Sequence, residues 1–243
     1  MPDPLIKVIG ELASTNSALL ARLAEGDTPH EGHWLVADRQ TAGRGRSGRV
    51  WTGGFGNFMG STAVALHGND ALPQTLALVA GVSVHRALMS VAPQLSGLAL
   101  KWPNDLLVGE AKLGGILLER QRDAVVVGIG VNLAQAPDVP GRKTASLAAL
   151  GHEVARDAFA SALAAAWAED LTAWHAGGWP ALREEWLARA LPKGTLLGVN
   201  LTEEGHVIGA FAGLEPGGAV LLRLADGAVR AIHAGDVELV GAS

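Results

Sequence analysis

The sequence contains no cysteine, and its charge content is modest. The absence of cysteine excludes disulfide bonds, thiolate metal sites and a cysteine nucleophile. Charged residues make up 18% of the 243 residues, and the formal net charge is −5. This acidic balance argues against a protein that coats nucleic acid. Hydrophobic residues make up 49% of the chain, which is too much for a disordered protein.

Long apolar runs are also missing. The run from Leu5 to Ile9 is too short for an export signal and has no basic segment before it. The longest apolar segment, Leu76 to Val91, is interrupted by His85 and Arg86, which favours a core helix over a membrane span. We therefore expect a cytoplasmic protein that does not contact a membrane.

Several familiar catalytic and nucleotide-binding motifs are absent. The chain has no GxSxG elbow and no HExxH motif, which leaves serine and metal hydrolases without support. The histidines are scattered, with only His30 and His33 close together, so we expect no metal-ligating set. Residues 43–48 fit the GxGxxG pattern, but the glycine-rich segment that follows cannot form the helix of a dinucleotide fingerprint. No Walker A motif is present either.

The order of apolar and polar segments predicts an α+β fold. From Leu98 to Leu133, short apolar segments alternate with tight polar turns, which favours an antiparallel meander. We expect a mixed, largely antiparallel sheet with flanking helices in residues 1–191 and a small β-barrel in residues 192–243. Further strands are predicted at Leu5–Ile9, Trp34–Ala37 and Phe58–Leu66, and helices after Ser14–Asn16, over Leu72–Val91 and within Gly151–Ala190.

A long glycine-rich segment from Asp38 to Asn57 has neither a helical nor a strand period, which is typical of a functional loop. It carries Arg44, Arg46 and Arg49. Guanidinium groups bind carboxylate and phosphate oxygens, and glycines let backbone N–H groups approach a ligand. Because the like charges repel, we expect the loop to stay mobile until an anion binds. The alternatives are a solvated basic loop or an RNA-binding arginine–glycine tract, and the acidic chain disfavours the second.

Two further regions place polar side chains beside glycines. The first combines Lys101–Asp105, a proline-containing turn, with Lys112–Gly115 on the next predicted strand. The second is Gly128–Asn132, where two glycines in an apolar strand permit close approach of a ligand. Taken singly, each has a simpler structural explanation: a hairpin with an exposed lysine, or a strand bend that ends in a turn asparagine.

Together these segments resemble biotin–protein ligases, in the form of a monofunctional biotin–[acetyl-CoA-carboxylase] ligase. The combination of GRGRSGRVW at 43–51 with KWPND at 101–105 is highly specific, whereas either alone is moderate evidence. The resemblance covers essentially the whole chain and implies a class II synthetase-like catalytic domain followed by an SH3-like barrel. The matching segments are Ser14–Asn16, Gln40–Trp51, Lys101–Asp105, Lys112–Leu117 and Gly128–Asn132.

The resemblance implies a two-step reaction. Biotin and ATP, with Mg²⁺, would give biotinyl-5′-AMP and pyrophosphate. The biotinyl group would then pass to one lysine of the biotin carboxyl carrier domain of a carboxylase. Fixed cations suit the first step, because two anions must meet at contact distance.

The resemblance also implies roles for individual residues. Catalysis would involve Lys112 and Arg44 at the reacting centre, and Asp105, supported by Asn104, would orient or deprotonate the acceptor lysine. Trp51 would lie against adenine. The implied biotin-binding set is Ser14, Thr15, Asn16, Gln40, Gly43, Arg44, Gly45, Arg46, Lys112, Gly114 and Gly115. The implied ATP and adenylate set is Arg46, Arg49, Trp51, Lys112 and Asn132, and no residue is assigned to a metal.

Two other functions remain open at this point. One is a lipoate–protein ligase, which the complete GRGRSGRVW and KWPND segments disfavour. The other is a non-catalytic biotin-binding module, which would be expected to lose Lys112 or the arginines. Because the ligase pattern starts within the first residues, we expect no DNA-binding domain and no DNA partner. The protein is expected to be a monomer or a homodimer.

Overall fold

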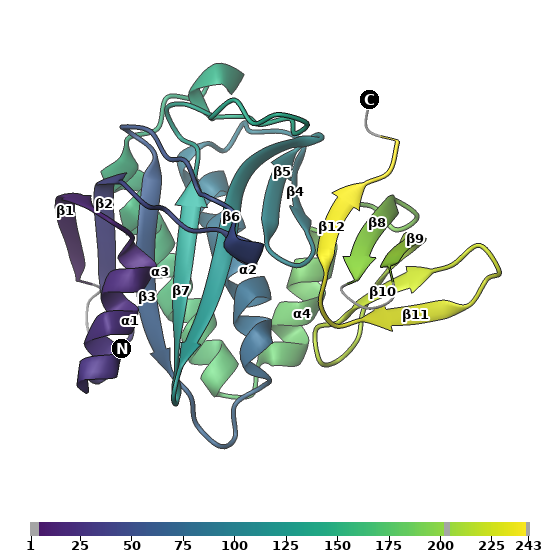
Figure 1. The fold of residues 1–243 in the computed structure, drawn as a ribbon, viewed down its shortest axis with the longest axis horizontal. Coiled ribbons are helices and arrows are strands. Elements are labelled where there is room, and N and C mark those ends of the chain that lie inside the picture. Colours follow the sequence, from purple (N-terminus) through teal and green to yellow (C-terminus); the bar gives the residue numbers. More distant parts are fainter. Residues whose placement is uncertain (1–4, 202–204, 242–243) are drawn as a thin grey trace.

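A seven-stranded sheet forms the centre of the larger part of the molecule (Figure 1). The computed structural model describes residues 5–201 and 205–241. The strand order is β1-β2-β3-β7-β6-β5-β4. The strands are β1 (Ile6–Leu12), β2 (Trp34–Gln40), β3 (Phe58–Ala65), β4 (Leu98–Lys101), β5 (Asp105–Val108), β6 (Ala111–Gln121) and β7 (Ala124–Val131).

The pairing of the strands confirms the predicted mixed, largely antiparallel sheet. Among the strands of this sheet in the described residues, β1 and β2 are the one parallel pair, and the connection between them contains a helix, as a parallel crossover requires. The strands β4 to β7 follow one another as antiparallel neighbours, joined by short turns. This is the meander that the alternation of apolar segments and polar turns predicts.

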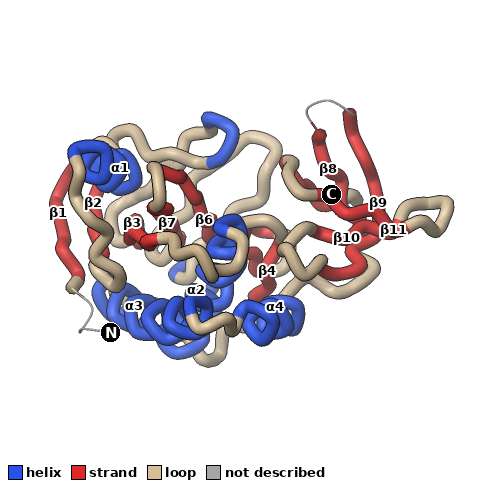
Figure 2. Tube along the Cα trace, turned by 90° about the horizontal axis from the view of Figure 1, so that it is seen from below, coloured by secondary structure: helices blue, strands red, loops and turns tan. Residues whose placement is uncertain are grey.

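Helices cover both faces of this sheet (Figure 2). Helix α1 (Thr15–Glu25) packs on one face against β3, β6 and β7. Helices α2 (Leu76–Val91) and α3 (Arg156–His175) cover the other face, with α4 (Trp179–Ala188) beside α2. Three short 3₁₀ helices complete the set: η1 (Arg46–Gly48), η2 (Pro73–Thr75) and η3 (Ala148–Leu150).

The apolar helix α2 is a core helix, as its interrupted sequence predicts. The helical segment Pro73–Val91 is long and apolar enough to cross a membrane, but most of it is buried inside the protein. Its side chains pack against the sheet and against α3 and α4. The burial of α2 between the sheet and helices α3 and α4 thus accounts for the length and hydropathy of this segment.

The C-terminal part forms a separate five-stranded antiparallel sheet with the order β11-β10-β9-β8-β12. Leu197 and Phe211 belong to the same continuous hydrophobic core as the larger part, and Trp102 Nε1 donates to the Gly218 carbonyl at 2.9 Å. The division between residues 191 and 192 stays a prediction, and the predicted ends at residues 1–4 and 242–243 lie outside the described residues. The strands are β8 (Leu196–Leu201), β9 (Gly205–Leu214), β10 (Val220–Arg223), β11 (Val229–Ile232) and β12 (Asp236–Leu239).

Strand β2 is longer than its sequence predicts. Asp38, Arg39 and Gln40 were assigned to the glycine-rich loop, but they continue the strand, and Arg39 and Gln40 pair with β1. These residues are polar, Arg39 is exposed and the other two are only partly buried, so the apolar pattern stops before the strand does. The loop therefore starts after Gln40.

Candidate active site

A cavity of about 1350 Å³ opens between the large sheet and the C-terminal sheet. Its walls come from the start of α1, the arginine loop, strands β5 to β7, the segment 137–144 and strands β8, β9 and β12. The predicted site residues line this cavity, with the exceptions of Gly43 and Gly114. A Cβ atom at Gly114 would face the Gly130 carbonyl on the neighbouring strand, so Gly114 serves strand packing and not the cavity.

The start of α1 forms one polar wall. The Ser14 hydroxyl caps the helix by accepting from the Ser17 amide at 3.3 Å, which orients the next residues into the cavity. Gln40 Oε1 accepts from the backbone N–H of Thr15 at 2.7 Å and from its hydroxyl at 3.1 Å. The buried Ser61 hydroxyl lies 2.6 Å from both Thr15 Oγ1 and Asn16 Oδ1. These hydrogen bonds within the protein hold the side chains in place without a ligand.

The two glycines of β7 make room for protein side chains. A Cβ atom at Gly128 would overlap the Asn16 carboxamide, and one at Gly130 would overlap the Trp51 indole. Sequence reasoning assigned these glycines to close approach of a ligand. In the structure they allow Asn16 and Trp51 to lie directly on the strand, where these side chains form the cavity floor.

The arginine loop is held by carboxylates and carbonyls from other elements. Arg44 pairs with Glu119 at 2.8 Å, and Arg49 pairs with Asp236 of β12 at 2.5 Å. Arg46 donates to Asn104 Oδ1 at 3.2 Å and to the Gly235 carbonyl at 3.1 Å. The loop therefore bridges the two sheets, and each of its three guanidinium groups has an acceptor in the protein.

Asp105 lies between two lysines at the centre of the cavity. Its Oδ2 is 2.8 Å from Lys101 Nζ, and its Oδ1 is 2.5 Å from Lys112 Nζ. Burial alone would raise the pKa of this carboxyl, but the two ammonium groups outweigh it and lower the pKa to about 2. Asp105 is therefore an anion throughout the physiological range. With one carboxylate and two ammonium groups, the cluster keeps a surplus positive charge.

The two asparagines of the site have different environments. Asn104 donates to the Ile116 carbonyl at 2.8 Å and accepts from Arg46, and it makes no hydrogen bond to Asp105 among the described contacts. Asn132 is buried and donates to the Ala145 carbonyl at 3.1 Å. Its Oδ1 has no hydrogen-bond partner in the described part of the chain. A buried acceptor without a partner on a cavity wall is suited to a ligand donor.

Comparison with known proteins agrees with this geometry. Residues 9–133 match the model of the biotin/lipoate A/B protein ligase family, and residues 198–240 match the biotin protein ligase C-terminal domain. The biotin–[acetyl-CoA-carboxylase] ligase of Paracoccus denitrificans is 37% identical over 86% of this chain and 90% of its own length. The chain belongs to the biotin protein ligase family.

Other members of this family extend the match. The biotin–[acetyl-CoA-carboxylase] ligase of Mycobacterium tuberculosis is 35% identical over 96% of this chain and 88% of its own length. Among solved structures, the Aquifex aeolicus biotin protein ligase in complex with biotin and ATP superimposes with a TM-score of 0.83 at 27% identity. That match covers 97% of this chain and 99% of the Aquifex chain. The predicted α+β fold is thus the fold of the biotin protein ligase family.

Four residues of this ligase site were not singled out from the sequence. Glu119 on β6 links Arg44 to Asn16, whose Nδ2 donates to Glu119 Oε2 at 2.9 Å. Lys101 pairs with Asp105, and Ser61 contacts Thr15 and Asn16 at the start of α1. Asp236 holds Arg49 from a different sheet. The KWPND segment contained the signal for Lys101, but the other three depend on contacts that no local pattern encodes.

Proposed function

We propose that this chain activates biotin with ATP to biotinyl-5′-AMP and transfers the biotinyl group to a lysine of a biotin carboxyl carrier domain. The observation that carries the proposal is the gathering, in one cavity, of the arginine loop, Lys112 and the polar start of α1. Membership of the biotin protein ligase family, with relatives named for biotin at 35–37% identity, favours biotin over lipoate as the substrate.

The cations of the cavity suit the first step. A biotin carboxylate oxygen attacks the α-phosphorus of ATP, and the bond to the bridging oxygen of the leaving pyrophosphate breaks. Both reactants are anions, so their approach is opposed until positive charge surrounds them. Lys112, Arg44 and Arg46 would supply that charge, with ATP entering as its Mg²⁺ complex. In exchange, the two arginines would give up their present acceptors, Glu119 and Asn104.

The biotin ring would lie at the polar start of α1. A ureido group carries N–H donors and one carbonyl acceptor, and it needs fixed partners of both kinds. Ser14, Thr15, Asn16 and Gln40 offer both, and hydrogen bonds already hold Thr15, Asn16 and Gln40 in place. Gly45 and Gly115 line the same cavity and keep the backbone accessible.

The nucleotide would lie on the side of Trp51 and Asn132. The Trp51 indole rests on Gly130, with Lys112 Nζ 5.7 Å from its ring centre. Adenine would stack beside this indole, and the free Oδ1 of Asn132 would accept a hydrogen bond from the nucleotide. Arg49 would keep the loop closed over it.

Asp105 would orient the acceptor lysine in the second step. The neutral amine nitrogen attacks the acyl carbon of the adenylate, the bond to the AMP phosphate oxygen breaks, and the proton that the nitrogen loses passes to solvent. A carboxylate with a pKa of about 2 is a weak proton acceptor, so we assign orientation to Asp105 and not deprotonation. Asn104, which contacts Arg46, would support the loop at the reacting centre.

The proposal is tested by pyrophosphate release from ATP in the presence of Mg²⁺ and biotin. A biotin carrier domain is added in a second series, and lipoate replaces biotin in a third. We expect release with biotin, multiple turnover when the carrier domain is present, and no release with lipoate. Absence of release with biotin would contradict the proposal, and release with lipoate alone would support a lipoate ligase.

A further inference from the structure

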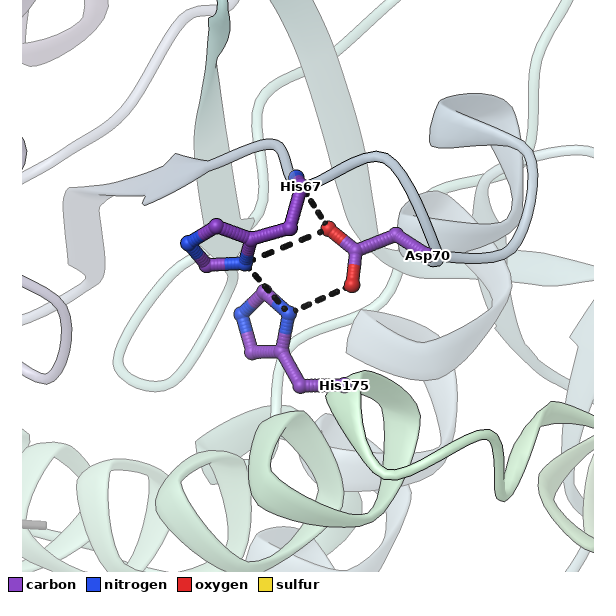
Figure 3. A group of neighbouring side chains, drawn as sticks. All are labelled: His67, Asp70 and His175. Atoms are coloured by element: carbon purple, nitrogen blue, oxygen red, sulfur yellow. Dashed lines mark hydrogen bonds and ion pairs between the residues drawn. The ribbon is translucent and has the colours of Figure 1, made fainter.

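A second polar cluster lies beyond the end of β3, away from the cavity, and Figure 3 shows its side chains. It consists of His67 and Asp70, in the connection between β3 and η2, and His175 at the end of α3. None of these residues lines the cavity described above. In the sequence, only His30 and His33 are histidines close together. The fold instead brings together two histidines that are 108 positions apart.

The three side chains turn their ligand atoms toward one point. His67 Nδ1 lies 3.4 Å from His175 Nδ1 and 3.6 Å from Asp70 Oδ2, and His175 Nδ1 lies 2.8 Å from Asp70 Oδ1. In a tetrahedral zinc site with metal–ligand distances of about 2.0–2.1 Å, neighbouring ligand atoms are about 3.3 Å apart. The 3.4 Å between the two Nδ1 atoms is close to this value. Asp70 contacts the two histidines through different oxygens, so a rotation of its carboxylate would bring one oxygen toward both, and one ligand atom from each residue already lies within 4.8 Å of the others.

A second carboxylate orients His175. Glu31 Oε1 lies 3.1 Å from His175 Nε2 and also accepts from the Ala65 amide at 3.0 Å. With Nε2–H donated to Glu31, His175 would present Nδ1 to a metal ion, which would replace the proton that Nδ1 shares with Asp70 Oδ1 at 2.8 Å. Metal-ligating histidines usually donate their other ring N–H to a carboxylate, a backbone carbonyl or water, and Glu31 is such a partner. Asp70 is fixed in turn, because its Oδ2 accepts from the His67 amide at 2.6 Å.

The exposure of the cluster leaves a route for an ion. The side chain of Asp70 is 5% exposed and that of His175 is 18% exposed, whereas that of His67 is 63% exposed. An ion would therefore enter past His67 and keep one coordination position for water. Two imidazoles and one carboxylate suit Zn²⁺ and neighbouring divalent transition metals, whereas Mg²⁺ prefers oxygen ligands. We propose that His67, Asp70 and His175 form a binding site for a Zn²⁺-class metal ion that fastens the end of α3 to the β3–η2 connection.

Cobalt provides the direct test, because Co²⁺ takes the same ligands as Zn²⁺ and absorbs visible light. Tag-free protein is stripped with EDTA and titrated with Co²⁺ alone, without biotin or ATP. We expect one equivalent of Co²⁺ to give visible absorption bands that an equivalent of Zn²⁺ removes. Zn²⁺ is also expected to raise the thermal midpoint, since an ion that binds the native state stabilises it by mass action.

Substitutions locate the ion. His67→Gln is the main variant, because His67 is mostly exposed and the fold is expected to tolerate the change. We expect His67→Gln to lower Co²⁺ affinity at least tenfold, and Glu31→Gln to lower it roughly tenfold through His175. His33→Gln, in the stacked His30–His33 pair, is the matched control and is expected to bind as the parent does. Binding that is absent, or unchanged in His67→Gln, would overturn the proposal.

Discussion

Two aspartates of this protein both pair with cations, but the pKa of one is lowered and that of the other is raised. Asp105, in the cavity, lies between Lys101 and Lys112, which lower its pKa to about 2. Asp170, on α3, is 2% exposed and shares Arg86 with Glu185. Burial raises the pKa of Asp170, and the Ser83 hydrogen bond and the Arg86 charge offset this only in part.

The difference lies in how many cations each aspartate contacts and in whether the cluster opens to the cavity. The cavity cluster has two cations for one carboxylate and opens to a space that can hold anionic substrates. In the helix layer, Asp170 contacts one guanidinium, that of Arg86, which it shares with Glu185. Glu185 also pairs with Arg189 at 3.3 Å, and these ion pairs join α2, α3 and α4. The first arrangement attracts ligands, and the second holds elements together. Changes in the cavity cluster should therefore affect turnover, and changes in the helix-layer cluster should affect stability.

The largest effect is expected from Lys112→Met, which removes the cation and keeps an aliphatic stem beside Trp51. Adenylate formation should fall about 100- to 1000-fold, as is typical when one stabilising group is lost from a reacting centre. Pyrophosphate release in single-turnover experiments measures the effect. The thermal midpoint should stay near that of the parent, because Lys101 still pairs with Asp105. Lys7→Met, on the exposed side of β1, is the control, and equal rates in both variants would refute the role of Lys112.

The next effect is expected from Asp170→Ala, which leaves Arg86 without its most buried acceptor. The free energy of unfolding should fall by about 3 kcal/mol, the usual cost of breaking a buried ion pair from one side. Denaturant titration measures this, and the folded fraction should keep the turnover of the parent. Asp157→Ala on the same helix removes a 76% exposed carboxylate and should change stability by less than about 0.5 kcal/mol. If Asp170→Ala also lost turnover per folded molecule, the assignment of stability to the helix-layer cluster and of turnover to the cavity cluster would be wrong.

A smaller, step-specific effect is expected from Asp105→Asn. The substitution keeps the shape of the side chain and removes the charge that would attract the acceptor lysine. Transfer from preformed adenylate to a carrier domain should slow roughly tenfold, or about 1.4 kcal/mol. Adenylate formation should change less, because its cations remain. Rapid-quench measurement of the two half-reactions separates them, and equal slowing of both would contradict a role confined to transfer.

The smallest effect concerns His85, which lies beside Arg86 in the helix layer. Burial, with a further contribution from the Arg189 charge, lowers its pKa from 6.5 to about 4. The folded state therefore binds this proton less readily than the unfolded chain does. The contribution of neutral His85 to the free energy of unfolding should be fully present above about pH 6.5. It should be lost as the pH falls toward 4, which lowers the free energy of unfolding by about 1 kcal/mol after allowance for partial exposure. His85→Gln should flatten this part of the pH–stability curve, and an unchanged slope would exclude His85 as the cause.

Local sequence patterns were sufficient for much of this structure. The meander from β4 to β7 and the core helix α2 follow from short-range alternation and periodicity. The arginine loop and the KWPND segment each carry their chemistry within a few positions, and both segments contribute residues to the cavity wall.

Contacts between distant segments could not be predicted in this way. Glu119 meets Asn16 across 103 positions and Arg49 meets Asp236 across 187, and both contacts depend on strand order and register. The polar end of β2 was missed because a half-exposed strand has no apolar period. His67 and His175 likewise meet across 108 positions, so no local pattern predicts their contact.

The glycines of β7 have a consequence for sequence variation. Every other amino acid carries a Cβ atom, and a Cβ at Gly128 or Gly130 would displace Asn16 or Trp51 from the cavity floor. In a saturation-mutagenesis screen, these two positions should reject even alanine, although neither glycine has a side chain with which to act. Intolerance there would report on the space that Asn16 and Trp51 occupy, and it should be relieved only when those residues are made smaller.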